Sequence, residues 1–304
     1  MKFSVVDTHC DTISALLDQK KQLLKNDLHI DKERMAAYAS YTQFFACFID
    51  PVYKDCALSR CLDIIDYFYA ETEADIQFCT SSKDLHKKRI SAFLSLEGGE
   101  PIDSLATLRA LYRLGVRCAA LTWNYSNHIA SGVLEPDGTR GLTDFGKTVV
   151  AEMERLGMLV DVSHLNEQSF WDIAKIAKKP FIASHSNSRA LCSHPRNLTD
   201  PQFLHIVKTG GCVGVNLYPL FLADSGRASV ADVIAHIEHF MALGGGDHIG
   251  VGADFDGVDM LPEGIDGVQD VEKIFNELLR LGYPEEAVQK IAYKNFERVI
   301  HICL

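Results

Sequence analysis

The sequence predicts an α/β fold with a single domain over residues 1–304, a (β/α)8 TIM-like barrel, and three observations lead to this prediction. Short apolar runs alternate with amphipathic helical patterns along the whole chain. Eight such runs can be counted, and several are apolar almost throughout, as parallel strands covered on both faces are. The length suits one barrel, and no linker separates blocks of different composition. Counting strands does not by itself distinguish a barrel from a doubly wound open sheet.

The predicted strands are short and spread evenly from the N-terminus to the C-terminus, with helical patterns between them. They are Phe3–Asp7, Thr42–Ile49, Ser91–Leu96, Cys118–Thr122, Leu159–Val162, Phe181–Ser184, Cys212–Leu217 and Ile249–Gly252.

The predicted helices carry apolar residues at three- and four-residue steps, and several end at glycine, the usual left-handed helix stop. They are Ile102–Leu114, Phe145–Leu156, Asn166–Ala177, Asp200–Lys208, Val230–Leu243 and Glu285–Ile300. Residues 16–41 and 126–144 have the character of insertions after the first and fourth strands. The second insertion contains the turn signal Pro136-Asp137-Gly138.

Composition indicates which partners the protein can bind and in which compartment it functions. The formal net charge of −11 argues against nucleic acid as a partner, because a negative field repels phosphates. No signal-peptide pattern begins the chain, and no apolar run approaches the roughly 18 residues that span a bilayer. Nine cysteines without CxxC pairs are typical of reduced thiols. We therefore expect a cytoplasmic protein with no membrane partner, and a homodimer as the commonest assembly.

A histidine and a carboxylate follow the first strand two residues apart. Side chains alternate faces along a strand, so His9 and Asp11 point the same way and Cys10 points oppositely. Asp7 shares this face and is interpreted as a residue that braces the strand. An imidazole and a carboxylate placed in this way can bind one divalent metal ion together.

Three further strand ends carry ligand-type side chains. Glu97 closes the third predicted strand, and His164 and His185 follow the fifth and sixth. In a barrel the carboxyl ends of the strands open on one face, where catalytic groups gather. A single histidine at such a place is more often structural, but five residues in phase on four strands predict a metal site.

The ligand types also indicate the metal. Imidazole and carboxylate without cysteine suit zinc, with manganese or cobalt allowed by the same chemistry. Three histidines and two acids are too many for one open zinc site and suit two ions bridged by a carboxylate. Paired metal ions of this kind can hold a hydroxide between them and polarise a substrate carbonyl.

These residues resemble the membrane (renal) dipeptidase family of the amidohydrolase superfamily, over nearly the whole chain. The 21-residue step from His164 to His185 matches, and Asn295–Val299 adds a weaker similarity. The motifs occur in family order: Asp7-Thr8-His9-Cys10-Asp11, Leu96-Glu97-Gly98-Gly99, Asp161-Val162-Ser163-His164, Ser184-His185-Ser186, Arg196-Asn197 and Gly252-Ala253-Asp254-Phe255-Asp256-Gly257.

The resemblance implies a role for each metal ligand. His9 and Asp11 would hold one zinc ion, His164 and His185 the other, and Glu97 would bridge them.

It also implies Asp254 as the general acid/base and Arg196 as the binder of the substrate's terminal carboxylate, a task suited to a planar fork of donors. Spacing alone would allow Asp256 in place of Asp254, and would allow Arg196 to be a loop-bracing residue.

One departure concerns the fourth predicted strand, where renal-type enzymes carry a substrate-binding histidine directly after Leu-Thr. Here Trp123 and Asn124 follow Leu121-Thr122. Asn124 is a candidate donor to the substrate carbonyl, and His128 is a candidate to reach the site from the loop.

The sequence thus predicts a dipeptidase that accepts a small-molecule dipeptide, with a D-residue at the second position as a family preference. Hydrolysis of N-acyl amino acids or lactams on the same site is the first alternative, because function depends on the loops. A barrel kept as a scaffold or sensor is the non-enzymatic alternative, although all five predicted ligands are present.

Overall fold

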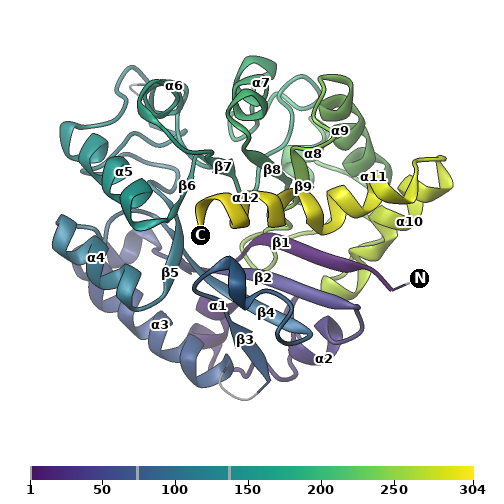
Figure 1. The fold of residues 1–304 in the computed structure, drawn as a ribbon, viewed down its shortest axis with the longest axis horizontal. Coiled ribbons are helices and arrows are strands. Elements are labelled where there is room, and N and C mark those ends of the chain that lie inside the picture. Colours follow the sequence, from purple (N-terminus) through teal and green to yellow (C-terminus); the bar gives the residue numbers. More distant parts are fainter. Residues whose placement is uncertain (1, 73–74, 136–137) are drawn as a thin grey trace.

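Eight parallel strands close into a barrel in the computed structural model, which describes residues 2–72, 75–135 and 138–304 (Figure 1). Closure follows from the pairing, since β1 pairs with β2 on one side and with β9 on the other, and β2 also pairs with β4. The barrel strands are β1 (Ser4–Cys10), β2 (Ser40–Phe48), β4 (Ile90–Glu97), β5 (Val116–Ala120), β6 (Leu159–Asp161), β7 (Ile182–Ala183), β8 (Cys212–Val215) and β9 (Ile249–Val251).

Each of these strands corresponds to one of the eight predicted runs, and closure decides against the open sheet. The prediction misses β3 (Ile76–Phe78), which pairs with β4 alone and is too short to show a periodic pattern.

Helices surround the barrel and cover its outer face (Figure 1). All six predicted helical segments are present, but three shorter helices, α1, α2 and α8, are missing from the prediction. Also missing are α3 (Ala57–Thr72) and α10 (Glu272–Arg280), although these two bury apolar residues at helical spacing. The helices are α1 (Thr12–Gln19), α2 (Lys32–Met35), α3 (Ala57–Thr72), α4 (Leu105–Arg113), α5 (Asp144–Leu156), α6 (Glu167–Ile176), α7 (Asp200–Thr209), α8 (Pro219–Leu222), α9 (Val230–Ala242), α10 (Glu272–Arg280), α11 (Glu285–Gln289) and α12 (Asn295–Cys303).

The two predicted insertions differ in content. The first holds α2 and the end of α1, and in the second the described residues contain no helix or strand before α5 begins at Asp144. The predicted turn at Pro136-Asp137-Gly138 lies partly outside the described residues, which exclude Pro136 and Asp137.

The last helix, α12, closes one end of the barrel and crosses it in Figure 1. One π-helical turn, Lys290–Lys294, joins it to α11. Its Phe296 belongs to a buried cluster with inward-facing residues of the strands, among them Val6, Phe44 and Phe93. Removing a fully buried phenylalanine side chain costs roughly 3–5 kcal/mol. Since α12 fills this end, ligands must enter from the carboxyl ends of the strands.

At the carboxyl ends of the strands, the backbones after β7 and β9 approach each other so closely that Gly252 must be glycine. A Cβ atom at Gly252 would lie 1.8 Å from the carbonyl oxygen of Ser184, so no other residue fits without moving β7 or β9.

Among the helices of the described residues, none combines the length and apolar character needed to cross a membrane.

Candidate active site

The predicted metal ligands and Asp254 all lie where barrel strands end. His9 is the penultimate residue of β1, Glu97 is the last residue of β4, and Asp11 directly precedes α1. The remaining residues follow the ends of β6, β7 and β9 within three positions; they are His164, His185 and Asp254. The structure therefore brings together the side chains that the sequence places on one face.

The first strand contains an irregularity that helps to aim these groups. Its register against β2 shifts between Asp7 and Cys10, and Cys10 packs in the outer core while His9 faces the site. Asp7 is buried and accepts hydrogen bonds from the backbone N–H of Ala253 and His9 and from the Tyr41 hydroxyl. Burial raises its pKa to about 6. Asp7 therefore ties β1 to the residues after β9, which agrees with the predicted bracing role.

The first ligand group consists of His9, Asp11 and Glu97, all buried. Nε2 of His9 lies 3.5 Å from Oδ2 of Asp11 and 3.3 Å from Oε2 of Glu97. Nε2 of His9 and Oδ1 of Asp11 have no hydrogen-bond partner among the described residues. Buried polar atoms without partners are costly, and a cation between these atoms would satisfy both.

The second group consists of Glu97, His164 and His185. Oε1 of Glu97 lies 2.7 Å from Nε2 of His164 and 3.7 Å from Nε2 of His185. The two ring nitrogens are 2.8 Å apart. Glu97 therefore turns one oxygen toward His9 and the other toward the second pair of histidines.

Hydrogen bonds behind the two histidines fix which ring nitrogen carries the proton. The Ser184 hydroxyl donates to Asp161, so it accepts from Nδ1 of His185, which lies 2.7 Å away. Nδ1 of His164 lies 2.9 Å from the amide oxygen Oδ1 of Asn124, which can only accept. Both histidines thus carry their proton on Nδ1 and present an unprotonated Nε2 to Glu97.

This arrangement of lone pairs fits a metal ion. Burial, with Arg196 adding to it, lowers the pKa of His164 to about 3, and burial lowers the pKa of His185 well below its usual range. Two neutral rings then face each other and a carboxylate oxygen with lone pairs that repel. A divalent cation turns this repulsion into coordination.

Charge balance points the same way. Three carboxylates, those of Asp11, Glu97 and Asp254, are buried together with one guanidinium, that of Arg196. Burial raises the pKa of both Asp11 and Asp254, and the charge of Glu97 adds to this effect. Buried carboxylates in excess of buried cations favour the binding of a further positive charge.

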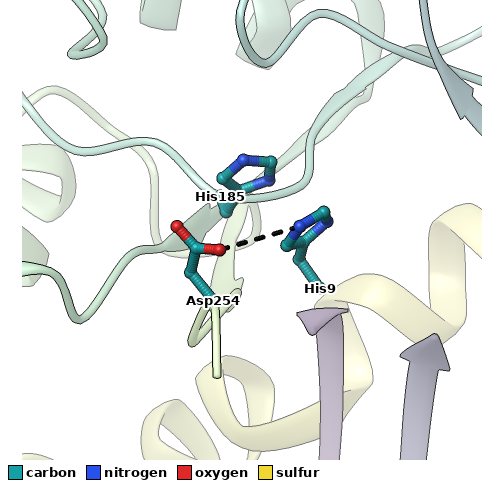
Figure 2. Close-up of side chains that lie close together, drawn as sticks. All are labelled: His9, His185 and Asp254. Carbon is teal, nitrogen blue, oxygen red and sulfur yellow. Dashed lines mark ion pairs between the residues drawn. The ribbon is translucent and has the colours of Figure 1, made fainter. Parts of the chain in front are cut away.

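His9, His185 and Asp254 form a third close group (Figure 2). The rings of His9 and His185 stack with their centroids 3.8 Å apart, and Oδ1 of Asp254 lies 3.7 Å from Nε2 of His9. The backbone at Asp254 and at His164 is left-handed, with φ of 63° and 69°. Left-handed backbone costs a residue with a side chain of the order of 1 kcal/mol, and such strain is frequent at functional sites.

Asp256, the sequence alternative to Asp254, is engaged elsewhere. Its Oδ2 accepts from the Thr12 hydroxyl at 2.5 Å, and its Oδ1 accepts from the backbone N–H of His29 at 2.7 Å. The first bond ties the start of α1 to the segment after β9, and the second ties the segment after α1 to it. Asp256 lines the cavity but acts as an anchor between loops, whereas Asp254 faces His9.

A cavity of about 290 Å³ opens above the candidate metal-ligand side chains, a size near the lower end for small-molecule sites. Asp11, Glu97, His164 and Asp254 form its polar floor. Arg196 also reaches it and is buried; its Nη2 donates to the carbonyl oxygen of His185 at 3.3 Å. The remaining walls are mainly aromatic and apolar: Phe48, Trp123, Tyr218, Phe221 and Val258.

The two candidate substrate-binding residues after β5 behave differently. Asn124 lines the cavity, but its amide oxygen is bonded to His164. His128 lies outside this cavity, on a neighbouring one, where Nε2 lies 2.7 Å from the Ile102 carbonyl oxygen and the ring stacks on Phe145. The structure therefore does not bring His128 to the ligand groups.

Sequence reasoning missed three polar residues behind the site, Asp161, Ser184 and Asn216. Asn216 is fully buried, and its Nδ2 donates to Oδ2 of Asp254 at 2.8 Å. Each of the three lies at the carboxyl end of a strand. A search for polar residues at the ends of apolar runs, which identified the candidate ligands, would therefore also have identified these three.

Comparisons with known proteins agree with this geometry. The family model described as membrane dipeptidase (peptidase family M19) matches residues 1–303. An uncharacterised protein in the pqqA 5′ region of Klebsiella pneumoniae is 35% identical over 79% of this chain and 93% of its own length. A Schizosaccharomyces pombe protein described as an uncharacterised dipeptidase is 33% identical over 88% of this chain and 72% of its own length.

Two solved structures have the same fold throughout. A dipeptidase of family M19 superposes with a TM-score of 0.92 at 26% identity, over 100% of this chain and 99% of the other. A metallopeptidase from Rhodobacter sphaeroides, liganded with a phosphinate mimic of the dipeptide L-Ala-D-Ala, superposes with a TM-score of 0.91 at 25% identity over 100% of both chains. With the whole-chain family match and buried groups that fit metal ions, the chain belongs to the membrane dipeptidase family, peptidase family M19, and is a metallo-dipeptidase.

Proposed function

We propose that this enzyme is a binuclear zinc dipeptidase. The observation that carries the proposal is the placement of Glu97, with Oε2 3.3 Å from Nε2 of His9 and Oε1 2.7 Å from Nε2 of His164. A carboxylate with one oxygen toward each of two histidine groups has the disposition of a bridging ligand. In this proposal His9 and Asp11 hold one ion, and His164 and His185 hold the other.

Zinc is the proposed metal because the ligand set combines imidazole and carboxylate without thiolate. When bound, the two ions supply positive charge that polarises the scissile carbonyl and a water molecule acidic enough to act near neutral pH.

Arg196 and Asp254 carry the rest of the reaction. Burial lowers the pKa of Arg196 to about 10, so its guanidinium is charged at neutral pH and can bind the terminal carboxylate of a dipeptide. Asp254 takes a proton from the attacking water as the new C–O bond forms. It returns that proton to the leaving nitrogen as the C–N bond breaks, which yields a free carboxylate and a free amine.

A D-residue at the C-terminal position is the proposed preference. The support is the Rhodobacter sphaeroides structure, whose ligand mimics L-Ala-D-Ala. The location proposed is the cytoplasm, since all nine cysteines are free thiols and eight of them are buried.

An assay panel tests the substrate assignment. Zinc-loaded enzyme is given L-L dipeptides, L-D dipeptides, N-acyl amino acids and lactams under the same conditions. We expect the highest kcat/KM for a dipeptide with a D-residue second. A higher value for N-acyl amino acids or lactams would replace the dipeptidase assignment with the alternative chemistry.

A pair of variants tests the assignment of the proton carrier. Asp254→Asn should lower kcat by about 10²–10⁴-fold, the contribution of a positioned acid/base group. Asp256→Asn is the matched control, because it lines the same cavity but serves as an anchor. A larger loss of kcat in the control than in Asp254→Asn would reverse the assignment.

A further inference from the structure

Asn216 lies directly behind Asp254 and is held in place on three sides. It follows β8 by one residue and is fully buried. Its backbone N–H donates to Oδ1 of Asn187 at 2.9 Å, and its carbonyl oxygen accepts from Nδ2 of the same residue at 3.0 Å. The side chain bonds to Tyr218 and to Asp254. Asn216 therefore has little freedom to move.

The bond to Tyr218 determines which way the Asn216 amide points. The backbone N–H of Tyr218 lies 2.6 Å from Oδ1 of Asn216 and can only donate, so the atom facing it must be the amide oxygen. The amide nitrogen then faces Oδ2 of Asp254, 2.8 Å away. Nδ2 can only donate, which means that Oδ2 of Asp254 must accept.

This one-way bond favours Oδ1 over Oδ2 as the position of the proton that Asp254 carries. Oδ2 cannot hold a proton toward Asn216, because two donors would face each other. Oδ1 points toward Nε2 of His9 at 3.7 Å, on the side of the ligand groups. The backbone of Asp254 is left-handed, with φ of 63°, and its N–H donates to the carbonyl oxygen of His9. Both features hold the backbone from which the carboxyl group projects.

We propose that Asn216 is a positioning residue for proton transfer, which holds Oδ2 of Asp254 as an acceptor and so turns Oδ1 toward the ligand groups, where the proton is transferred. The inference rests on the proposed role of Asp254. Without the amide donor the carboxyl group can rotate and protonate on either oxygen, so fewer enzyme molecules hold the proton where the leaving nitrogen needs it. The hydrogen bonds given for Asn216 go to Asn187, Tyr218 and Asp254, and not to Arg196 or to the five proposed metal ligands.

The test compares two substrates that differ in their leaving group, a dipeptide and its depsipeptide ester analogue. An amine must be protonated before it leaves, whereas an alcohol depends less on this step. For Asn216→Ala we expect kcat on the dipeptide to fall about 10–100-fold with KM within about twofold, and a clearly smaller loss on the ester. Zinc content per chain should equal that of the wild type.

Two further variants keep the test decisive. Asn216→Leu keeps a side chain of similar size and removes the donor without adding a charge, so it should show the same leaving-group dependence if Asn216→Ala fails to fold. Asn295→Ala is the matched control, since it removes a buried amide that bonds only backbone oxygens, those of Gly246 and Ile249. It should lower the free energy of unfolding without any leaving-group dependence.

The outcomes separate the inference from the proposed function. Equal losses of kcat on both substrates, a KM effect in place of a kcat effect, or no loss would overturn the role of Asn216. If Asp254→Asn keeps wild-type kcat, the proposed function fails at its proton carrier instead. An enzyme without activity on any dipeptide would refute the proposed function itself.

Discussion

The hydroxyl of Ser184 accepts a hydrogen bond from Nδ1 of His185 at 2.7 Å and donates its own proton to Asp161. This chain of bonds keeps the proton of His185 on Nδ1 and leaves Nε2 available as a ligand. Hydrogen bonds of this kind behind metal ligands are worth about 10–100-fold in metal affinity.

Ser184→Ala should therefore weaken zinc binding by about 10–100-fold, measured by competition with a chelator of known affinity. Ser186→Ala is the matched control, because its buried hydroxyl has no partner among the described residues. Equal zinc affinities in the two variants would contradict the role given to Ser184.

Arg196→Met should raise KM for dipeptides about 100-fold with a smaller effect on kcat, because a charged pair in a buried site is lost while the metal groups stay intact. The variant should discriminate little between a dipeptide and its C-terminal amide, whereas the wild type should prefer the free carboxylate. Steady-state kinetics on this substrate pair gives the answer. A preference for the free carboxylate that survives in the variant would show that another residue binds it.

Trp123→Ala should widen the range of substrates. The Trp123 side chain lines both the cavity above the metal-ligand groups and a neighbouring cavity of about 320 Å³, so it forms part of the wall between them. Its removal should raise the ratio of tripeptide to dipeptide kcat/KM, measured in one assay series. Tyr125→Ala, which lines only the neighbouring cavity, should leave the ratio unchanged. The same ratio in all three enzymes would exclude Trp123 as a determinant of substrate length.

A pH-dependent contribution to stability is expected from Glu152, far from the site. Hydrogen bonds from Arg155 and Arg109 lower its pKa to about 2. Since the folded pKa lies below the ordinary value of 4.5, the unfolded chain takes up the proton first as the pH falls. Glu152 thus stabilises the fold above this range and loses that effect as the pH falls through it.

Glu152→Gln should lower the free energy of unfolding by about 1 kcal/mol at pH 7, and the difference from the wild type should shrink between about pH 5 and about pH 2. Urea denaturation at several pH values measures both. A difference that stays constant over this range would mean that the charge of Glu152 is not the cause.

Much of the barrel can be predicted from sequence because its strands are buried on both faces and therefore read as apolar runs. Each predicted run became a barrel strand. The positions at which strands begin and end cannot be predicted in the same way, because they depend on pairing with neighbouring strands. The strand β7, for example, has only two residues, Ile182 and Ala183. The addition of β3 to β4 depends on tertiary contact alone. The homodimer stays a prediction.

The candidate site was predictable in its ligand groups because strand ends of a barrel converge on one face. Hydrogen-bond direction could not be predicted. The sequence suggests Asn124 as a donor to substrate through its amide nitrogen, and it gives no sign of the bond between the amide oxygen and His164. It also suggests that His128 could reach the site, but the loop directs the ring toward Phe145 and Ile102. Both outcomes depend on loop conformation, which has no periodic signal.

Zinc content, measured by elemental analysis together with the dipeptidase rate in the wild type and in His164→Ala, tests the central claim most directly. The account predicts two zinc ions per chain and full activity in the wild type. In the variant it predicts one zinc ion per chain and a rate at least about 100-fold lower, because one ion loses a ligand. Unaltered zinc content and rate in His164→Ala, or a fully active wild type with a single zinc ion, would contradict it.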